Sequence, residues 1–192
     1  MARTEVIAKR GPRSKTFDNG DGTFALEVGG GIAHHQKDGA WVETDITWKN
    51  SATELLTGEW PGQVKVNKGT RAITLLPQGA TVPITLAPLG HNKKAPAPTY
   101  EGNRITFTGL WTGIDLNVYL TPEGIALHYT KTAHPCANPG WTLPGEAAAF
   151  LRGGESYMSE GEDGLPVVVP HTLANGMYTL DFATAPVGAV VS

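Results

Sequence analysis

Residues 14–26, "SKTFDNGDGTFAL", contain the strongest structural signal in the chain. Apolar residues alternate with polar ones on both sides of a central DNGDG. Asn and Gly adopt positive φ angles at low steric cost, so they form the tight turns that join antiparallel strands. We therefore expect a β-hairpin, with strands around Lys15–Phe17 and Thr23–Val28.

The same stretch fails two tests for a ligand-binding loop. An EF-hand calcium loop needs an oxygen ligand at its third position and an acid at its twelfth, but counting from Asp18 these positions hold Gly20 and Gly29. A dinucleotide-binding G-x-G-x-x-G motif needs a third glycine where this chain has Ala25, and a helix must follow it. The sequence therefore favours a plain turn.

Alternation of apolar and polar residues continues along most of the chain. It recurs in segments such as 41–48, 63–68 and 114–120, with Gly-bearing turns between them. The 24 glycines and 14 prolines are too many for a helical protein. The pattern predicts an all-β fold, a β-sandwich-like domain of many short antiparallel strands. Helix signals are weak: residues 51–58 and 144–153 each suit either a short helix or an irregular segment.

The length of 192 residues suits one domain. We expect a basic, extended N-terminal arm over residues 1–14 and a single β-rich domain over residues 15–192. Within that domain, residues 132–154 are rich in Pro, Gly and Ala and predict an irregular excursion.

Two basic groups are candidate contacts with a partner. The arm carries its cations against a single acid, Glu5, and a Pro-containing loop over residues 89–103 carries the second group. The arm suits contact with a phosphate backbone or an acidic neighbouring subunit, and the loop suits contact with a partner, or both are simply solvated. The net charge of −3 gives no general argument for nucleic acid, so we expect no specific nucleic-acid partner. The candidate contact residues are Arg3, Lys9, Arg10, Arg13, His91, Lys93 and Lys94.

No catalytic, cofactor-binding or metal-ligating residue is expected. His34 and His35 are adjacent, so on a strand they point to opposite faces, and we expect one to pack inward and one outward. The nucleophile motif G-x-S-x-G is missing, and the single cysteine, Cys136, lies near His134 without an orienting group that spacing reveals. A small hydrolase using Asp115 and Glu123 stays open as a minor hypothesis.

The chain shows no membrane or export signal. No segment reaches about 18 apolar residues, and the N-terminus lacks the apolar stretch of a signal peptide. We expect synthesis in a cytoplasm and no membrane partner. Five tryptophans leave open a surface that stacks on sugars.

Two stretches, residues 14–48 and 100–132, resemble the β-rich domain at the start of Rhs-like and wall-associated bacterial surface proteins and of related tailed-phage virion proteins. The family shows S-K-T-F-x-x-G-D-G-x-F, then I-H-Y-K-D-x-x-W-x-x-I-D, and later a G-I-D-L segment. The matching residues are Ser14, Lys15, Thr16, Phe17, Gly22, Phe24, Ile32, His34, Lys37, Asp38, Trp41, Asp45, Thr112, Gly113, Ile114, Asp115, Leu116, Tyr119, Gly124 and Ile125.

The resemblance implies a non-enzymatic role in assembly. It suggests a structural virion protein of a tailed bacteriophage, as a capsid decoration, head-fibre or tail component. Its partners would be other virion proteins and copies of itself, and its location would be the virion, after synthesis in the host cytoplasm. The alternative is a carbohydrate-binding or adhesion module of a bacterial or phage surface protein, with a glycan as ligand.

Overall fold

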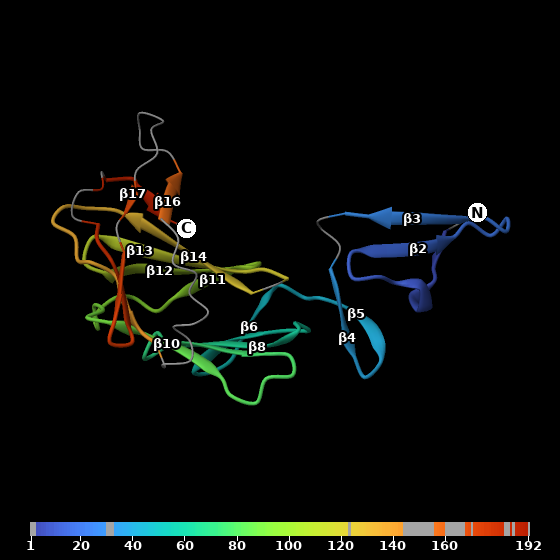
Figure 1. The fold of residues 1–192 in the computed structure, drawn as a ribbon, viewed down its shortest axis with the longest axis horizontal. Coiled ribbons are helices and arrows are strands. Elements are labelled where there is room, and N and C mark those ends of the chain that lie inside the picture. The colour runs from blue at the N-terminus through green and yellow to red at the C-terminus, as the bar shows by residue number, and fades with distance from the viewer. Residues whose placement is uncertain are drawn as a thin grey trace.

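The fold is all-β, as the sequence predicts (Figure 1). Every strand pairing in the described residues is antiparallel. The computed structural model describes residues 3–29, 33–122, 124–143, 156–159, 168–169, 171–182, 185 and 187–191.

Two sheets stack face to face in the larger part of the molecule (Figure 1). In spatial order, the first sheet contains β18 (His171–Ala174), β19 (Met177–Leu180), β15 (Gly140–Thr142), β10 (Ile84–Leu89), β9 (Ile73–Pro77), β8 (Gly62–Asn67), β7 (Glu54–Thr57) and β6 (Trp48–Asn50). The second contains β11 (Thr99–Glu101), β12 (Arg104–Trp111), β13 (Ile114–Leu120), β14 (Ile125–Lys131), β20 (Val190–Val191), β16 (Ser156–Ser159) and β17 (Val168–Val169).

Strand β13 shows why the alternating pattern folds this way. Its residues alternate between fully buried apolar side chains and half-buried polar ones. The first sheet presents a matching inner row from β7, β8 and β9, and both rows are fully removed from water. Each such side chain contributes about 1.5–3 kcal/mol by burial. The buried rows are Ile114, Leu116, Val118 and Leu120 on β13, and Leu55, Val64, Val66 and Ile73 facing them.

Four buried tryptophans tie the two sheets to each other. Each indole N–H donates a hydrogen bond to the opposite sheet or to one of its turns. The bonds are Trp48 to Asn103 O (2.9 Å), Trp60 to Thr121 O (2.7 Å), Trp111 to Leu89 O (2.7 Å) and Trp141 to Tyr129 Oη (2.6 Å). These bonds satisfy the one polar atom of each indole inside the core.

The weak helix signal over residues 51–58 is wrong. Glu54–Thr57 form strand β7, in which Leu55 is fully buried and pairs with Val66 of β8. The expected excursion over 132–154 contributes strand β15, whose Trp141 packs edge-on against Trp111 with ring centroids 5.4 Å apart. Residues 144–154 of that excursion, with the second weak helix signal, lie outside the described residues.

Lys131 at the end of β14 is fully buried, which is rare for a lysine. Its ammonium group donates to the carbonyl oxygens of Phe182 (2.8 Å) and Ala185 (2.5 Å). These bonds hold Phe182 and Ala185 close to the end of β14.

Lys131→Met keeps the length of the side chain but leaves both carbonyls without this donor. Hydrogen bonds to a charged group contribute about 1.5–3 kcal/mol each, so we expect a loss of about 3 kcal/mol in the free energy of unfolding. Urea denaturation measures this. Lys93→Met, at an exposed lysine, should change stability by less than about 0.5 kcal/mol. Equal urea midpoints for both variants would contradict the buried role of Lys131.

The expected N-terminal arm is instead folded into a separate three-stranded sheet, which we call the N-terminal sheet. It contains β1 (Thr4–Glu5), β2 (Ser14–Asp18) and β3 (Phe24–Val28), with a 3₁₀ turn, η1 (Ile7–Lys9), between β1 and β2. Residues 4–5 pair with 17–18, so a boundary at residue 14 would cut through this sheet.

The turn at DNGDG is confirmed as the bend of a hairpin between β2 and β3. Its aspartates bind their own backbone: Asp18 accepts from the Gly20 N–H at 2.8 Å, and Asp21 accepts from Thr23 N–H at 2.9 Å. Gly20 and Gly22 have φ angles of 77° and 85°, which non-glycine residues rarely adopt. These aspartate oxygens are thus used in shaping the turn.

A hairpin of β4 (His34–Lys37) and β5 (Ala40–Glu43) lies between the N-terminal sheet and the sandwich (Figure 1). His34 Nδ1 lies 2.8 Å from Gly11 O on one side, and His35 Nδ1 lies 3.1 Å from Thr44 Oγ1. Both histidines are buried. The expectation of one outward imidazole is therefore wrong: the two rings do take different partners, but both are covered.

Polar contacts join this hairpin to the sandwich. Lys37 Nζ donates to both carboxylate oxygens of Glu59, at 2.7 and 3.0 Å, and Asp45 N–H donates to Glu59 O at 2.7 Å. Asp45 in turn accepts from Lys49 Nζ (2.8 Å) and from Thr47. These hydrogen bonds, led by that from Lys49, lower the pKa of Asp45 to about 2.

A lowered carboxylate pKa stabilises the fold above the unfolded-state pKa near 4, and that stability is lost as pH falls towards 2. We expect Asp45→Asn to cost about 1 kcal/mol at pH 7, after allowance for solvent screening of this partly exposed group, and about nothing at pH 2. Thermal unfolding across this pH range measures the difference. Asp38→Asn, in the exposed hairpin turn, makes the same charge change and should show no such trend. A constant difference between Asp45→Asn and the parent from pH 7 to 2 would contradict the assignment.

Candidate functional site

The predicted basic residues of the N-terminus lie in the N-terminal sheet, where most of their charge is paired within the chain. Arg10 forms an ion pair with Glu5 at 2.7 Å, and Arg3 forms one with Glu27 at 3.3 Å. Lys9 Nζ lies 3.8 Å from the centre of the Phe24 ring. Arg13 also has an interaction partner. This group is therefore not a bare cationic surface.

The second predicted group lies in the connection between β10 and β11, a different part of the fold. Lys93 and Lys94 are exposed, whereas His91 is half-buried with Nδ1 3.1 Å from Pro88 O. The structure therefore does not bring the two basic groups together into one surface.

Arg71, which sequence reasoning missed, fixes this connection. It is buried, and its guanidinium donates to the carbonyls of Ala95 and Pro96, both at 3.1 Å, and to that of Lys68. Burial lowers the pKa of Arg71 from its ordinary value. The Pro-containing loop is thus held down at Ala95, which is buried. A hollow of about 310 Å³ beside it is lined by Gly69, Thr70, Arg71, His91 and Lys93.

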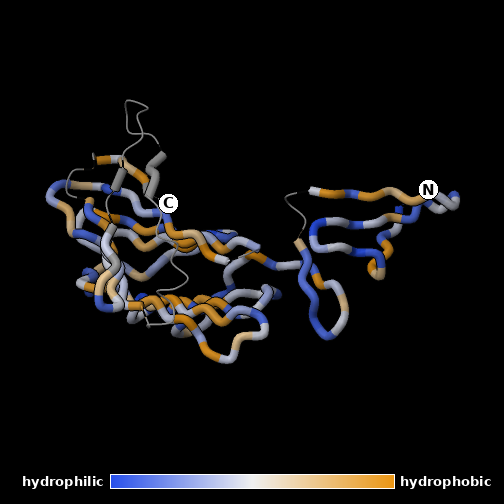
Figure 2. Tube along the Cα trace, viewed as in Figure 1, coloured by the Kyte–Doolittle hydropathy of each residue, from blue (hydrophilic) through white to orange (hydrophobic). Residues whose placement is uncertain are grey.

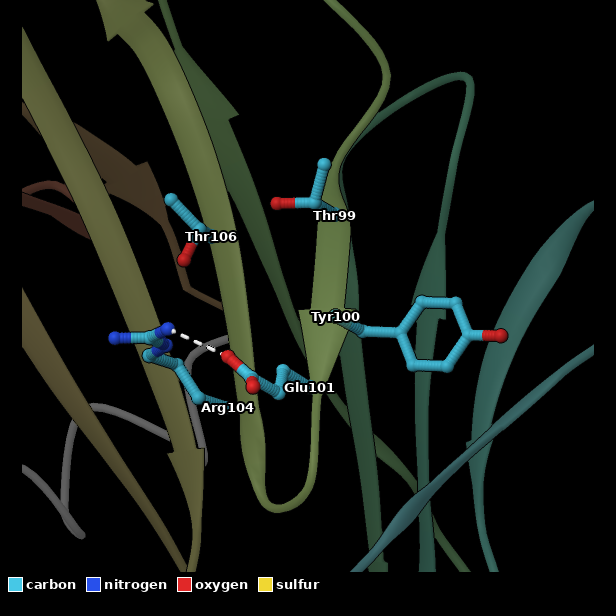
Figure 3. Close-up of a pocket in the computed structure, with 5 residues that line it drawn as sticks. All are labelled: Thr99, Tyr100, Glu101, Arg104 and Thr106. Carbon is cyan, nitrogen blue, oxygen red and sulfur yellow. Dashed lines mark hydrogen bonds and ion pairs between the residues drawn. The ribbon is translucent and has the colours of Figure 1, made fainter.

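A second hollow, of about 320 Å³, lies on the β11–β12 hairpin (Figure 3). Arg104 donates to Glu101 at 3.1 Å, and the Tyr100 ring points away from these side chains. The residues lining it are Thr99, Tyr100, Glu101, Arg104 and Thr106, and they contain no nucleophile paired with a base.

The acidic residues of the hydrolase hypothesis are not seen together. Asp115 accepts a hydrogen bond from Gly109 N–H at 2.7 Å, next to an irregularity in the β12–β13 register, so its carboxylate shapes the backbone there. Glu123 lies outside the described residues. Within the described ranges, no three or more His, Cys, Asp and Glu side chains gather as a metal site would require.

The tryptophans do not form an exposed aromatic platform. Trp48, Trp60, Trp111 and Trp141 are between 1 and 6% exposed, and Trp41, in the β4–β5 hairpin, is half-buried. Stacking on a sugar ring needs an accessible aromatic face. These indoles instead pack the sandwich.

Three apolar side chains on one strand of the N-terminal sheet are exposed: Phe24, Leu26 and Val28, at 53, 65 and 69%. They lie on β3, the outer strand of the sheet, where Figure 2 shows hydrophobic colouring. The alternation in residues 23–28 places these three residues on one face, but it does not reveal that the face stays exposed, with Lys9 lying over the Phe24 ring. An exposed apolar stripe on an edge strand is typical of a protein contact.

Comparison of the chain with protein-family models, curated proteins and solved structures gave no match. In the part of the chain that the structure describes, no helix has the length and apolar character needed to cross a bilayer.

Arg71→Met removes the donors that hold the β10–β11 connection. We expect local opening of this loop, and at least about tenfold faster trypsin cleavage after Lys93 and Lys94, because hydrogen bonds to a charged group resist opening by about 1.5–3 kcal/mol. Mass spectrometry of the fragments measures this. Arg104→Met, which loses only an exposed pairing with Glu101, should leave the cleavage rate unchanged. Equal rates in both variants would show that Arg71 does not hold the loop.

Proposed function

We propose that this chain is a non-enzymatic structural virion protein of a tailed bacteriophage, a capsid decoration, head-fibre or tail component that acts through protein–protein assembly. The observation that carries the proposal is the N-terminal sheet, which projects from the sandwich and exposes the apolar stripe of β3 (Figures 1 and 2). The resemblance of residues 14–48 and 100–132 to β-rich surface and virion domains supports it.

The architecture suits an assembly role. A sandwich tied by four tryptophan hydrogen bonds gives a rigid body, and a small sheet joined to it through a polar hairpin offers a contact surface at a distance from that body. Weak contacts of this size become strong when a symmetric particle repeats them many times.

Two observations favour this function over the alternatives. Four of the five tryptophans are packed in the core, where they offer no face for stacking on a sugar ring. The two hollows described above bring together no nucleophile, base and orienting group of the kind that catalysis requires.

The test is the presence of the chain in particles. Virions induced from the organism that encodes the chain are purified on a density gradient, and the protein is quantified by mass spectrometry. We expect it to band with the major capsid or tail proteins, at a fixed number of copies per particle. An antiserum against the recombinant chain should label the head or tail in electron micrographs.

Labelling must be lost when the gene is deleted, which controls for adhering host protein. Absence of the chain from washed particles would overturn the proposed function. Binding to cell-wall glycans by the free chain, together with that absence, would support the adhesion module instead.

A further inference from the structure

Strand β3 has one open edge. The order of the N-terminal sheet is β1-β2-β3, so β3 pairs with β2 on one side, and no described strand lies on the other. An open edge presents unpaired backbone donors and acceptors and is a template for another strand.

The hydrogen bonds at both ends of the β2–β3 ladder show which residues face that edge. Asn19 N–H donates to Thr23 O at 3.1 Å, and Gly29 N–H donates to Arg13 O at 3.3 Å. Along an antiparallel ladder, successive residues direct their N–H and C=O groups alternately towards and away from the partner. The odd-numbered residues of β3 therefore face β2.

The even-numbered residues, Phe24, Leu26 and Val28, consequently direct their backbone groups to the open edge. They are the same three residues whose side chains form the exposed apolar stripe. A second strand that pairs with this edge would therefore meet both backbone hydrogen-bonding groups and apolar side chains along the five residues of β3.

We propose that β3 pairs with β3 of a second copy of this chain, antiparallel about a two-fold axis at Leu26. In this register Leu26 lies opposite Leu26 of the other copy, and Phe24 lies opposite Val28. If the two-fold axis passes through a hydrogen-bonded pair, the central residue must direct its backbone N–H and C=O towards the open edge, as Leu26 does. With Leu26 at the centre, the backbone groups of Phe24, Leu26 and Val28 all form hydrogen bonds with the other copy. The two N-terminal sheets then form one six-stranded sheet.

The charges on the opposite face are compatible with this pairing. Glu27 lies opposite Ala25 of the other copy, so no two like charges stand directly across from each other. The Glu27 carboxylate already pairs with Arg3 of its own chain, and Arg3 also lies 4.8 Å from the centre of the Phe17 ring. The two glutamates therefore approach only diagonally, each beside its own cation.

The contact is small. Five strand residues with three exposed apolar side chains cover on the order of 400 Å² on each copy, about half of what one partner contributes to a standard stable interface. The pair is therefore expected to be weak in dilute solution and to gain strength through repetition. This inference rests on the proposed assembly function for its setting, and it names the partner and the surface.

The first experiment uses charge complementation at the centre of the register. Leu26→Lys and Leu26→Glu are made separately, and sedimentation velocity follows each over a range of protein concentrations. The parent chain should show a reversible monomer–dimer equilibrium. Each variant alone should have a dimer dissociation constant at least tenfold higher, since like charges would face each other. An equimolar mixture of the two variants should recover pairing.

Val82→Lys is the matched control. It adds the same charge at a comparably exposed apolar side chain, 62% exposed, in the turn before β10. This variant should associate like the parent. Circular dichroism spectra that match the parent show that the position 26 variants are folded.

The second experiment tests the register by oxidative cross-linking in a Cys136→Ser background. Leu26→Cys should form a disulfide-linked dimer efficiently, because the two introduced thiols lie opposite each other. Ala25→Cys should cross-link poorly, because its counterpart in the other copy is displaced by two residues along the strand and lies diagonally rather than directly opposite.

A parent chain that stays monomeric at the highest concentration, or position 26 variants that associate as well as the parent, would overturn the pairing. Such a result leaves the proposed function intact if the chain still bands with particles. Absence from particles, with pairing intact in solution, would overturn the proposed function and leave the pairing standing.

Discussion

The hydrogen bonds of the buried indoles are the interaction on which the rest of the fold depends. Each of the four tryptophans lies between the sheets and donates across to the other layer, so the apolar rows of β7, β8, β9 and β13 are held in one relative position. A sheet-on-sheet contact made only of aliphatic side chains can slide, whereas a directional donor in an apolar surrounding fixes the register. Two of the four acceptors, Asn103 O and Thr121 O, lie in turns at the ends of strands of the second sheet.

The sequence allows local features of the fold to be predicted but not long-range burial. The turn at DNGDG and the alternation in β13 follow from neighbouring residues alone, and both are confirmed. Strand β15 was missed because its burial depends on Trp111, thirty positions earlier in the chain. Likewise, the two adjacent histidines alternate as a strand requires, but only the packing on both sides of the β4–β5 hairpin shows that both are covered.

The basic residues of the candidate site could be predicted from the sequence, but their partners could not, because those partners are brought near only by folding. Composition identifies the basic residues, but their charges are compensated by partners such as Glu5 and Glu27, which only the N-terminal sheet brings near. Arg71 gives no sequence signal, since its role depends on carbonyls more than twenty residues away. The apolar stripe on β3 can be predicted from the alternation of apolar and polar residues in the sequence. Alternation shows which side chains share one face of the strand, but not whether another part of the protein covers that face.

The positions of the tryptophans also determine which part of the molecule intrinsic fluorescence reports on. Four indoles report on the sandwich, because each is buried in its core, and the N-terminal sheet contains none. Trp41 alone lies in the hairpin between the two parts, and its carbonyl accepts from Arg10 of the N-terminal sheet. The intrinsic fluorescence of the chain therefore mainly reports the packing of the two sheets of the sandwich. Trp41 reports movement of the N-terminal sheet relative to the sandwich.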